Sequence, residues 1–431
     1  MPYDAERIVR TSHFKNLTYI ALSLNCGSAA GLDIAHSFLK HIEPELKKLG
    51  KTYHVYIVDK SSHFFWSTGS PRSVTSAALL PAEQLFAPIA DGFKSYDSSL
   101  YTVVHGTAES WDVGGRTVTI RLADGEITQT LPYYALVLAT GLRTPSPTTS
   151  LHGNYTISKA AIEDLNKKLT SAVSVIVAGG GPTGVETAGE IGHFLNGSGG
   201  WFSSRPANPK AKVTLITNAD QLLPVLSKPR ALKAETLLNN VGVDVLYNVS
   251  VVSTTTDADG KTTISLSNGE QWTADVYISA LGTTPNSEYV PTNLKNDKGY
   301  IKTNITTLRA DAAGPRVYVA GDIGDYSRGG FHNLYSAIPV LATNIKRDLL
   351  AAAASDDPDA KPEGPDRPFV ANESETQAVP IGPWGVGAVH GWGLPGFLVW
   401  LLKGRNYMIS NIPLTVNGDM VKRDNTNWNP S

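Results

Sequence analysis

The amino-acid sequence predicts an α/β protein built on two parallel β-sheets, with a small module at the C-terminal end. Apolar runs of strand length alternate with stretches of helical periodicity, and this alternation begins near residue 18 and again near residue 173. A chain of 431 residues also exceeds what one hydrophobic core usually organises. At least two domains are therefore expected.

The composition excludes several classes of function. The chain has 37 Lys and Arg residues against 39 Asp and Glu residues, so no overall field favours nucleic acid as a partner. Cys26 is the sole cysteine, which excludes an internal disulfide, a CxxC redox pair and a cysteine-based zinc site, and no metal site is predicted. The N-terminal segment lacks the apolar core of a secretion signal, so a cytoplasmic location is expected.

The order of elements predicts where the domains divide. A strand at 18–24, a helix to about Lys48 and a strand at 53–59 form a first βαβ unit, and 100–129 has the pattern of hairpins. Strands at 173–178, 212–217 and 243–247 begin a second series, a long helix is expected from Phe331 to Ala354, and the Pro-rich segment 355–368 is typical of a linker. The predicted division is 1–150 and 286–354 for the first domain, 151–285 for an inserted domain, and 355–431 for the linker and module.

A glycine-rich loop between strand and helix, VIVAGGGPTGVETAGE, predicts a dinucleotide site in the inserted domain. Gly179, Gly181 and Gly184 have the spacing for a tight turn, a close approach to a pyrophosphate and a helix-sheet contact. The helix N-terminus would face the phosphates. Glu186, in the first turns of this helix, either points toward the cofactor or lies on a solvated face with Glu190.

The choice between NADH and NADPH stays open. An acid at the end of the second strand would favour NAD and a base would favour NADP, but Thr217 and Asn218 are neither.

The first strand-turn-helix, which contains NCGSAAG, has a weaker fingerprint. Two alignments with a three-glycine loop are open: Cys26, Ser28 and Gly31, or Asn25, Gly27 and Ala30. Asparagine is the non-glycine residue that best tolerates a left-handed turn, so the loop could survive in the second alignment. Asp59 ends the strand 53–59, where an acid would bind a ribose hydroxyl.

Two later segments, YYALVLATGLRTP (133–145) and RVYVAGD (316–322), complete a recognisable pattern. With these blocks the chain resembles the apoptosis-inducing-factor-like, ferroptosis-suppressor-like branch of FAD-dependent pyridine nucleotide oxidoreductases, and fungal members in particular. The other blocks that carry the resemblance are SSHFFWSTGSPRSV, DVYISALGTTPN and the tail VPIGPWGVGAVHGWGLPGFLVWLLKGRNYM.

The resemblance implies two Rossmann-like domains, one for FAD and one for NAD(P)H. It implies hydride transfer from the nicotinamide to the flavin and delivery of electrons to a quinone or a similar small acceptor. It assigns roles as follows: Asp59 binds the adenosine ribose, Arg72 lies near the flavin, Thr140 and Gly141 line the FAD site, Asp322 binds the ribityl chain, and Glu186 and Gly282 flank the nicotinamide. The helix from Phe331 would aim at the flavin, with His332 in its first turn as a proton donor or a capping residue.

The first loop departs from the family pattern, because Cys26 and Ser28 stand where glycines are usual. A Cβ at a position with positive φ costs about 1–2 kcal/mol, and a side chain there would obstruct the pyrophosphate. Weakened FAD binding is expected. Two alternatives stay open: a specialised secondary-metabolite flavoenzyme, or a noncatalytic nucleotide-binding protein with a degenerate FAD loop.

The tail has nine uncharged residues, 394–402, followed by Lys403 and Arg405. This segment is too short to span a bilayer. It is expected to pack against the body of the protein or a second subunit, or to make a peripheral membrane contact suited to a lipid-soluble acceptor. His390, Trp392 and Trp400 could line an acceptor site.

Overall fold

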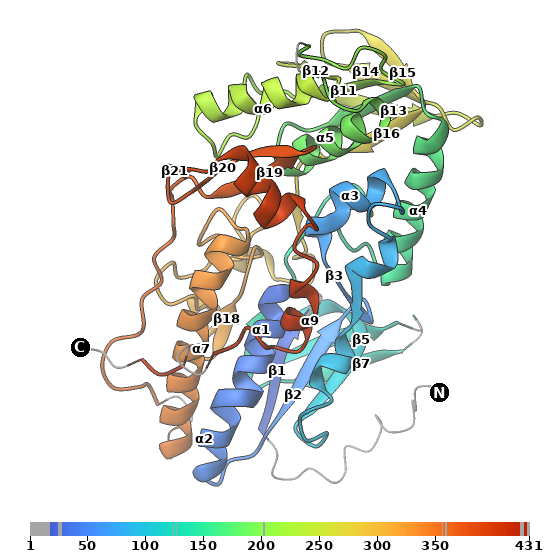
Figure 1. Cartoon of the computed structure of the whole chain (residues 1–431). Helices are drawn as coiled ribbons and strands as arrows, with labels where there is room; N and C mark the ends of the chain where they lie inside the picture. Colours follow the sequence, from blue (N-terminus) through green and yellow to red (C-terminus); the bar gives the residue numbers. More distant parts are fainter. Residues whose placement is uncertain are drawn as a thin grey trace.

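The computed structural model describes residues 18–24, 28–123, 125, 127–200, 203–355, 357, 360–422 and 426–428. Two parallel sheets with flanking helices are stacked along the long axis of the molecule, and the C-terminal segment runs beside both (Figure 1). The predicted α/β class with two Rossmann-like units is confirmed. The residue numbers at which the domains divide stay predictions.

The first sheet has the order β18-β8-β1-β2-β5-β6-β7. The first five strands in this order pair in parallel, whereas β5, β6 and β7 form antiparallel hairpins, as the sequence predicts. The strands are β1 Thr18–Leu24, β2 Tyr53–Asp59, β5 Tyr101–Asp112, β6 Thr117–Leu122, β7 Thr128–Pro132, β8 Ala135–Leu138 and β18 Val317–Val319.

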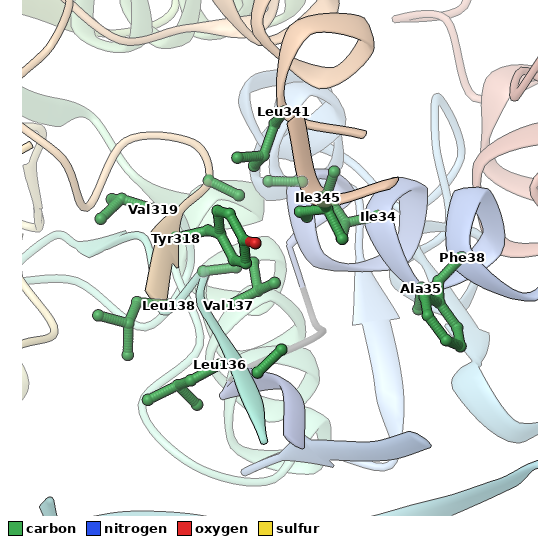
Figure 2. Packing of buried hydrophobic residues seen from close by; sticks show 14 of the residues in the cluster. Ile34, Ala35, Phe38, Leu136, Val137, Leu138, Tyr318, Val319, Leu341 and Ile345 are labelled. Atoms are coloured by element: carbon green, nitrogen blue, oxygen red, sulfur yellow. The ribbon is translucent and has the colours of Figure 1, made fainter. Parts of the chain in front are cut away.

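Helices α1 (Ala29–Ser37) and α7 (Phe331–Ala354) pack beside one another over this sheet. β8 is buried along its whole length because both of its faces are covered, which suits its continuous apolar sequence. Figure 2 shows Leu341 and Ile345 of α7 pointing toward Tyr318 of β18 and Ile34 of α1. α7 has the predicted bounds and contains Pro339 within it. This core therefore fixes where the N-termini of α1 and α7 lie.

The second sheet has the order β12-β11-β10-β16, and all its pairings are parallel. Its strands are β10 Ser174–Ala178, β11 Lys212–Ile216, β12 Val243–Leu246 and β16 Val276–Ser279. The helices of this half are α4 Tyr155–Ser171, α5 Pro182–Asn196 and α6 Lys228–Asn240. An antiparallel sheet of β13 Val251–Thr256, β14 Thr262–Leu266 and β15 Gln271–Ala274 lies beside them.

The chain crosses between the two halves through a short antiparallel pair, β9 (Leu142–Arg143) with β17 (Thr284–Pro285). The remaining short elements of the first half are α2 Glu43–Lys48, β3 His63–Phe65, α3 Ser70–Thr75 and β4 Phe86–Pro88. A π-helical turn at Phe38–Ile42 joins α1 to α2. The 3-10 turns are Ser67–Gly69, Ala82–Leu85, Ile89–Phe93, Thr292–Leu294 and Asp311–Ala313.

The C-terminal segment belongs to both cores. Its hairpin places Val379 and Val386 in the core of the second half, whereas Ile412 and Val416 lie in the core of the first half. Figure 1 shows this path, with β19 and β20 beside α5 and α6, and α9 beside α1. The elements are β19 Gln377–Ile381, β20 Trp384–Val389, β21 Trp392–Gly393, α8 Gly396–Val399, a π-helical turn Trp400–Gly404 and α9 Asn411–Val416.

Candidate functional site

The first nucleotide loop leads into α1 through Ser28, the N-cap residue of that helix. Its hydroxyl accepts a hydrogen bond from the Gly31 amide at 3.3 Å and donates one to the Ala139 carbonyl at 3.0 Å. The backbone of Ser28 is extended, with φ −103°. The prediction of backbone strain at Ser28 is therefore wrong, because Ser28 does not adopt a left-handed conformation.

The second loop decides between the two alignments of the first. Gly181 caps α5, and Gly184 follows it by three residues, just as Gly31 follows Ser28. Ser28 thus takes the place of the second glycine, and Gly31 takes the place of the third. Asn25, Cys26 and Gly27, which the sequence analysis also considers, lie outside the described residues.

A cavity of about 220 Å³ opens at the carboxyl ends of β8 and β18. It is lined by Thr140 and Gly141 after β8, by Asp322 after β18, and by Ser28 and Phe331 at the starts of α1 and α7. A second cavity of about 400 Å³ shares Lys60, Thr140 and Asn286 with the first. The structure therefore brings Ser28, Thr140, Gly141 and Asp322, four of the expected FAD-site residues, around one elongated space.

Asp322 is half-buried beside Gly330, the residue that precedes α7. Its Oδ1 accepts a hydrogen bond from the Gly330 amide at 2.9 Å. Burial raises the pKa of this carboxyl, and the hydrogen bond from Gly330 opposes the shift. A fixed acceptor beside a helix N-terminus is suited to a sugar or ribityl hydroxyl, and the binding of the ribityl chain by Asp322 stays a prediction.

Asp59 is the last residue of β2, Lys60 follows it, and the two side chains have different surroundings. Asp59 is 1% exposed, its Oδ1 accepts the Ser61 amide at 2.7 Å, and burial raises its pKa to about 7. Its neighbour Lys60 lines both cavities, and its ammonium makes no hydrogen bond or ion pair with the described residues. Lys60 was not singled out from the sequence, although a base directly after the strand-ending acid is a usable signal.

The space fits the dinucleotide FAD. The N-termini of α1 and α7 both open onto it, and such termini bind phosphate through free amides and the helix dipole. The ammonium of Lys60 supplies a positive charge at the junction of the two cavities. Amide donors at two helix N-termini, the ammonium of Lys60 and the carboxylate of Asp322 are the donor set that a diphosphate with ribose and ribityl hydroxyls needs.

In the second half, Gly179 and Gly184 are required by close packing. Gly179 has φ +128°, and a Cβ there would lie 2.3 Å from the Ala280 carbonyl oxygen. A Cβ on Gly184 would lie 1.8 Å from the Gly179 carbonyl oxygen. Space is open at Gly181, where a pyrophosphate would approach, and at Gly282, which has φ +45°. The expected nicotinamide nucleotide loop thus has the required backbone.

Thr217 follows β11 and is 4% exposed. Its hydroxyl accepts a hydrogen bond from the Ala219 amide at 3.3 Å. A side chain at Gly180 would touch it, since a Cβ there would lie 2.5 Å from Thr217 Oγ1. Thr217 has neither the acidic group that would favour NADH nor the basic group that would favour NADPH.

Glu186 lies inside the protein, so the solvated-face alternative is wrong. It is 3% exposed and accepts an ion-paired hydrogen bond from Lys403 at 2.5 Å. Burial raises the pKa of Glu186 to about 7, and Lys403 opposes this shift. Lys403 also donates to the Ala378 carbonyl at 3.2 Å. The C-terminal segment therefore supplies the partner of the expected nicotinamide-side acid.

Arg72 does not line either cavity. Its guanidinium binds Glu190 through two hydrogen bonds of 2.8 and 2.9 Å and donates to the Arg405 carbonyl at 3.0 Å. The same group lies 4.8 Å from the centre of the Tyr407 ring. The charge of Arg72 is thus committed to α5 and to the C-terminal segment, and its implied place near the flavin stays a prediction.

His332 faces the C-terminal segment from the first turn of α7. It hydrogen-bonds Asn372, and its ring lies 5.1 Å from that of His390. Its neighbour Phe331 lines the first cavity, whereas His332 does not. Burial and the nearby His390 lower the pKa of His332. This geometry therefore gives no support to His332 as a proton donor at the flavin, because its imidazole contacts the C-terminal segment and does not line the cavity.

The described residues hold no group of three or more His, Cys, Asp or Glu side chains that could bind a metal ion. None of their helices has the length and apolar character needed to cross a membrane. The functional residues that the sequence analysis missed are Lys60, Asn286, Phe331 and Tyr407, together with the pairing role of Lys403. Apart from Lys60, their place in the site depends on contacts between segments far apart in the chain, which no local pattern encodes.

The fold and the two nucleotide loops define the class of a two-dinucleotide oxidoreductase. The family model described as pyridine nucleotide-disulphide oxidoreductase matches residues 27–340. The chain belongs to this family.

Several known proteins are similar to this chain. "Oxidoreductase phnG" of Penicillium herquei is 39% identical over 392 residues, which cover 89% of this chain and 92% of the relative. "Oxidoreductase ptaL" of Pestalotiopsis fici is 32% identical over 401 residues, covering 92% and 98%. A partial relative, "Type II NADH:quinone oxidoreductase NdhA" of Mycobacterium tuberculosis, is 27% identical over 209 residues, covering 42% and 43%.

Among solved structures, NDH2 from Plasmodium falciparum in complex with NADH shares the fold. Its TM-score is 0.61 at 14% sequence identity, and the match covers 93% of this chain and 97% of that one. The fold of this chain thus has a counterpart of almost the same extent.

Proposed function

We propose that this protein oxidises NAD(P)H, passes the hydride to FAD and delivers the electrons to a quinone or a similar small acceptor. The observation that carries the proposal is the position of two nucleotide loops at the carboxyl ends of two parallel sheets joined by the β9–β17 crossover. Ligands of open α/β sheets bind at such ends. Bound FAD would supply the hydride and electron chemistry.

In this proposal the residues of the chain bind the cofactors, orient them and exclude water. The N-terminus of α1 and the ammonium of Lys60 would hold the diphosphate, the N-terminus of α7 would face the flavin, and Asp322 would orient a hydroxyl of the flavin chain. Glu186 and Lys403 join α5 to the C-terminal segment with a buried ion pair. Exclusion of water at such a junction strengthens the electrostatic interactions inside it.

A quinone is favoured as the acceptor by two observations. Cys26 is the sole cysteine, so a redox disulfide within the chain is impossible. The name of the partial mycobacterial relative also points to quinone reduction. The blocks that resemble the apoptosis-inducing-factor-like branch place this protein, in our proposal, in that branch of the family.

Purified protein tests the proposal. We expect flavin absorbance bands near about 375 and 450 nm, after FAD is added if necessary, because the flavin carries the chemistry. Anaerobic NADH or NADPH should bleach the longer-wavelength band, and a soluble quinone should restore it. Continuous oxidation of NADH or NADPH in the presence of the quinone would then show turnover.

Two results would contradict the proposal in different ways. Flavin that is bound but not reduced by either nicotinamide would favour a specialised secondary-metabolite flavoenzyme. Binding of NAD(P)H by calorimetry without any binding of FAD would favour a noncatalytic nucleotide-binding protein.

A further part of the proposal concerns an apolar surface of the C-terminal segment. Phe397, Trp400 and Leu401 share one helix face and are exposed, and Leu402 and Trp392 in the same part of the chain have exposures of 55% and 81%. One face of the segment 394–402 packs against the body of the protein, with Val399 0% exposed, and these five side chains lie on residues that the body leaves uncovered. We propose that the ridge, these five residues, rests on a membrane surface, since Trp, Phe and Leu partition to the lipid interface.

A further inference from the structure

Three segments far apart in the sequence meet at one buried arginine. Arg72 lies on α3 of the FAD half, Glu190 lies on α5 of the NAD(P)H half, and Tyr407 comes from the C-terminal segment. The Tyr407 hydroxyl donates to Glu190 Oε1 at 3.2 Å. The guanidinium of Arg72 forms both hydrogen bonds to the Glu190 carboxylate described above. We name these three residues the Arg72 cluster.

The Arg72 cluster is shielded from water. The exposed fractions are 14% for the Arg72 side chain and 4% for the Glu190 side chain, and Tyr407 is 0% exposed. Tyr407 is itself held, since its carbonyl accepts a hydrogen bond from the Trp66 indole at 2.8 Å. A bidentate Arg–carboxylate pair fixes orientation as well as distance, because two parallel hydrogen bonds define a plane.

This contact constrains the helix that begins at the nicotinamide loop. α5 starts at Pro182, directly after Gly181, and Glu190 lies one turn beyond Glu186. Any rotation or sliding of α5 against α3 would break both hydrogen bonds to Arg72. The glycine loop and Glu186 move with α5, so the Arg72 cluster fixes their position relative to the FAD half.

We infer that Arg72 is a positioning residue, which acts through Glu190 to hold the nicotinamide nucleotide at reacting distance from the flavin. The inference rests on the proposed function. Binding of NAD(P)H depends mainly on the phosphate loop, which the Arg72 cluster does not touch, whereas hydride transfer depends on the separation and angle of the two rings. Loss of the cluster should therefore lower kcat much more than it raises KM.

The variants Arg72→Gln, Arg72→Lys and Glu190→Gln, with the double variant Arg72→Gln/Glu190→Gln, test this inference. Arg72→Gln should keep its flavin and lose about tenfold or more in kcat, with KM for NADH changed by less than about threefold, because a displacement of about 1 Å can cost about 100-fold. Arg72→Lys should fall between the wild type and Arg72→Gln. The double variant should lose no more than the worse single variant, since both remove one interaction.

Hydrogen exchange gives a readout that does not depend on turnover. Amides of 183–190 on α5 should exchange faster in Arg72→Gln than in the wild type, with or without FAD. Arg205→Gln is the matched control, because Arg205 forms an exposed ion pair with Asp244 in the same half as α5. It should change neither the exchange of α5 nor kcat.

Two results would overturn the inference. In one, kcat is unchanged although the melting temperature falls, which would make the Arg72 cluster purely structural. In the other, exchange of α5 is unaffected by Arg72→Gln. If Arg72→Gln does not fold, Arg72→Lys and Glu190→Gln decide by the same measurements. If the wild type binds no flavin, the proposed function fails, while the exchange comparison still decides whether Arg72 holds α5.

Discussion

At the scale of single residues, Ser28 shows how one side chain replaces a glycine in a nucleotide loop. Glycine serves such loops by adopting unusual backbone angles or by leaving room. Ser28 needs neither, because its backbone is extended and its hydroxyl caps α1 and bonds the Ala139 carbonyl. The hydroxyl is thereby held against the protein instead of standing free in the phosphate path.

This geometry predicts that Ser28→Gly does not increase the flavin content of the purified protein. Ser28→Ala should destabilise the protein by about 0.5–2 kcal/mol through loss of the helix cap, and Ser28→Gly by only a few tenths of a kcal/mol. Flavin absorbance per mole and thermal melting measure the two effects. Ser37→Ala on the same helix is a control, since Ser37 bonds the Asp33 carbonyl away from the cavity. A rise in flavin content in Ser28→Gly would show that the side chain does obstruct the cofactor.

At the scale of elements, α5 combines two functions in one helix. Its N-terminus carries the glycine loop, and its second and third turns carry the buried acids Glu186 and Glu190. The loop would bind a nucleotide through its backbone. The two buried acids are instead paired with cations from other segments, Glu186 with Lys403 and Glu190 with Arg72. A change in the loop should therefore affect nucleotide binding without disturbing the acids.

Two glycine substitutions should separate packing from ligand approach. Gly184→Ala places a Cβ 1.8 Å from a carbonyl oxygen, so it should lower the melting temperature and abolish NAD(P)H binding together. Gly181→Ala meets open space, so it should fold normally and still weaken NAD(P)H binding by about tenfold or more, because the added methyl group obstructs the pyrophosphate. Calorimetry with NADH and thermal melting test both variants.

Gly200→Ala is the matched control, since a Cβ there also meets open space and lies away from the loop. FAD content should be normal in Gly181→Ala and Gly200→Ala. Normal NADH affinity in Gly181→Ala would contradict the position that we assign to the pyrophosphate.

At the scale of the whole molecule, the C-terminal segment connects the two halves. It contributes to both hydrophobic cores, and it brings Lys403 to Glu186 and Tyr407 to Glu190. The relative placement of the two nucleotide sites therefore depends on this segment as well as on the β9–β17 crossover. The same segment exposes the apolar ridge on its outer side.

The ridge should bind lipid vesicles. We expect the wild type to float with vesicles of neutral and anionic phospholipid, and the variant Phe397→Ser/Leu401→Ser/Leu402→Ser to remain in solution with its flavin and its quinone turnover unchanged, because these side chains contact solvent. Ile127→Ser/Val370→Ser, which removes exposed apolar side chains that are not part of the ridge, is the control and should still float. A wild type that does not float but forms dimers, which the triple variant loses, would assign the ridge to a second copy of the chain.

The sequence by itself determined the α/β class, the restart of the fold, the bounds of α7 and the loop at Gly179, Gly181 and Gly184. These features depend on local periodicity and on backbone requirements that residues meet within one strand-turn-helix. It also identified Thr140, Gly141 and Asp322 through their resemblance to a family. Only the tertiary structure decided that Arg72 pairs with Glu190 of α5, that Lys403 pairs with Glu186, and that His332 contacts the C-terminal segment and does not line the cavity. The physical reason is that a buried charge takes its role from the partners that distant segments bring to it, and those partners are set by packing rather than by spacing along the chain.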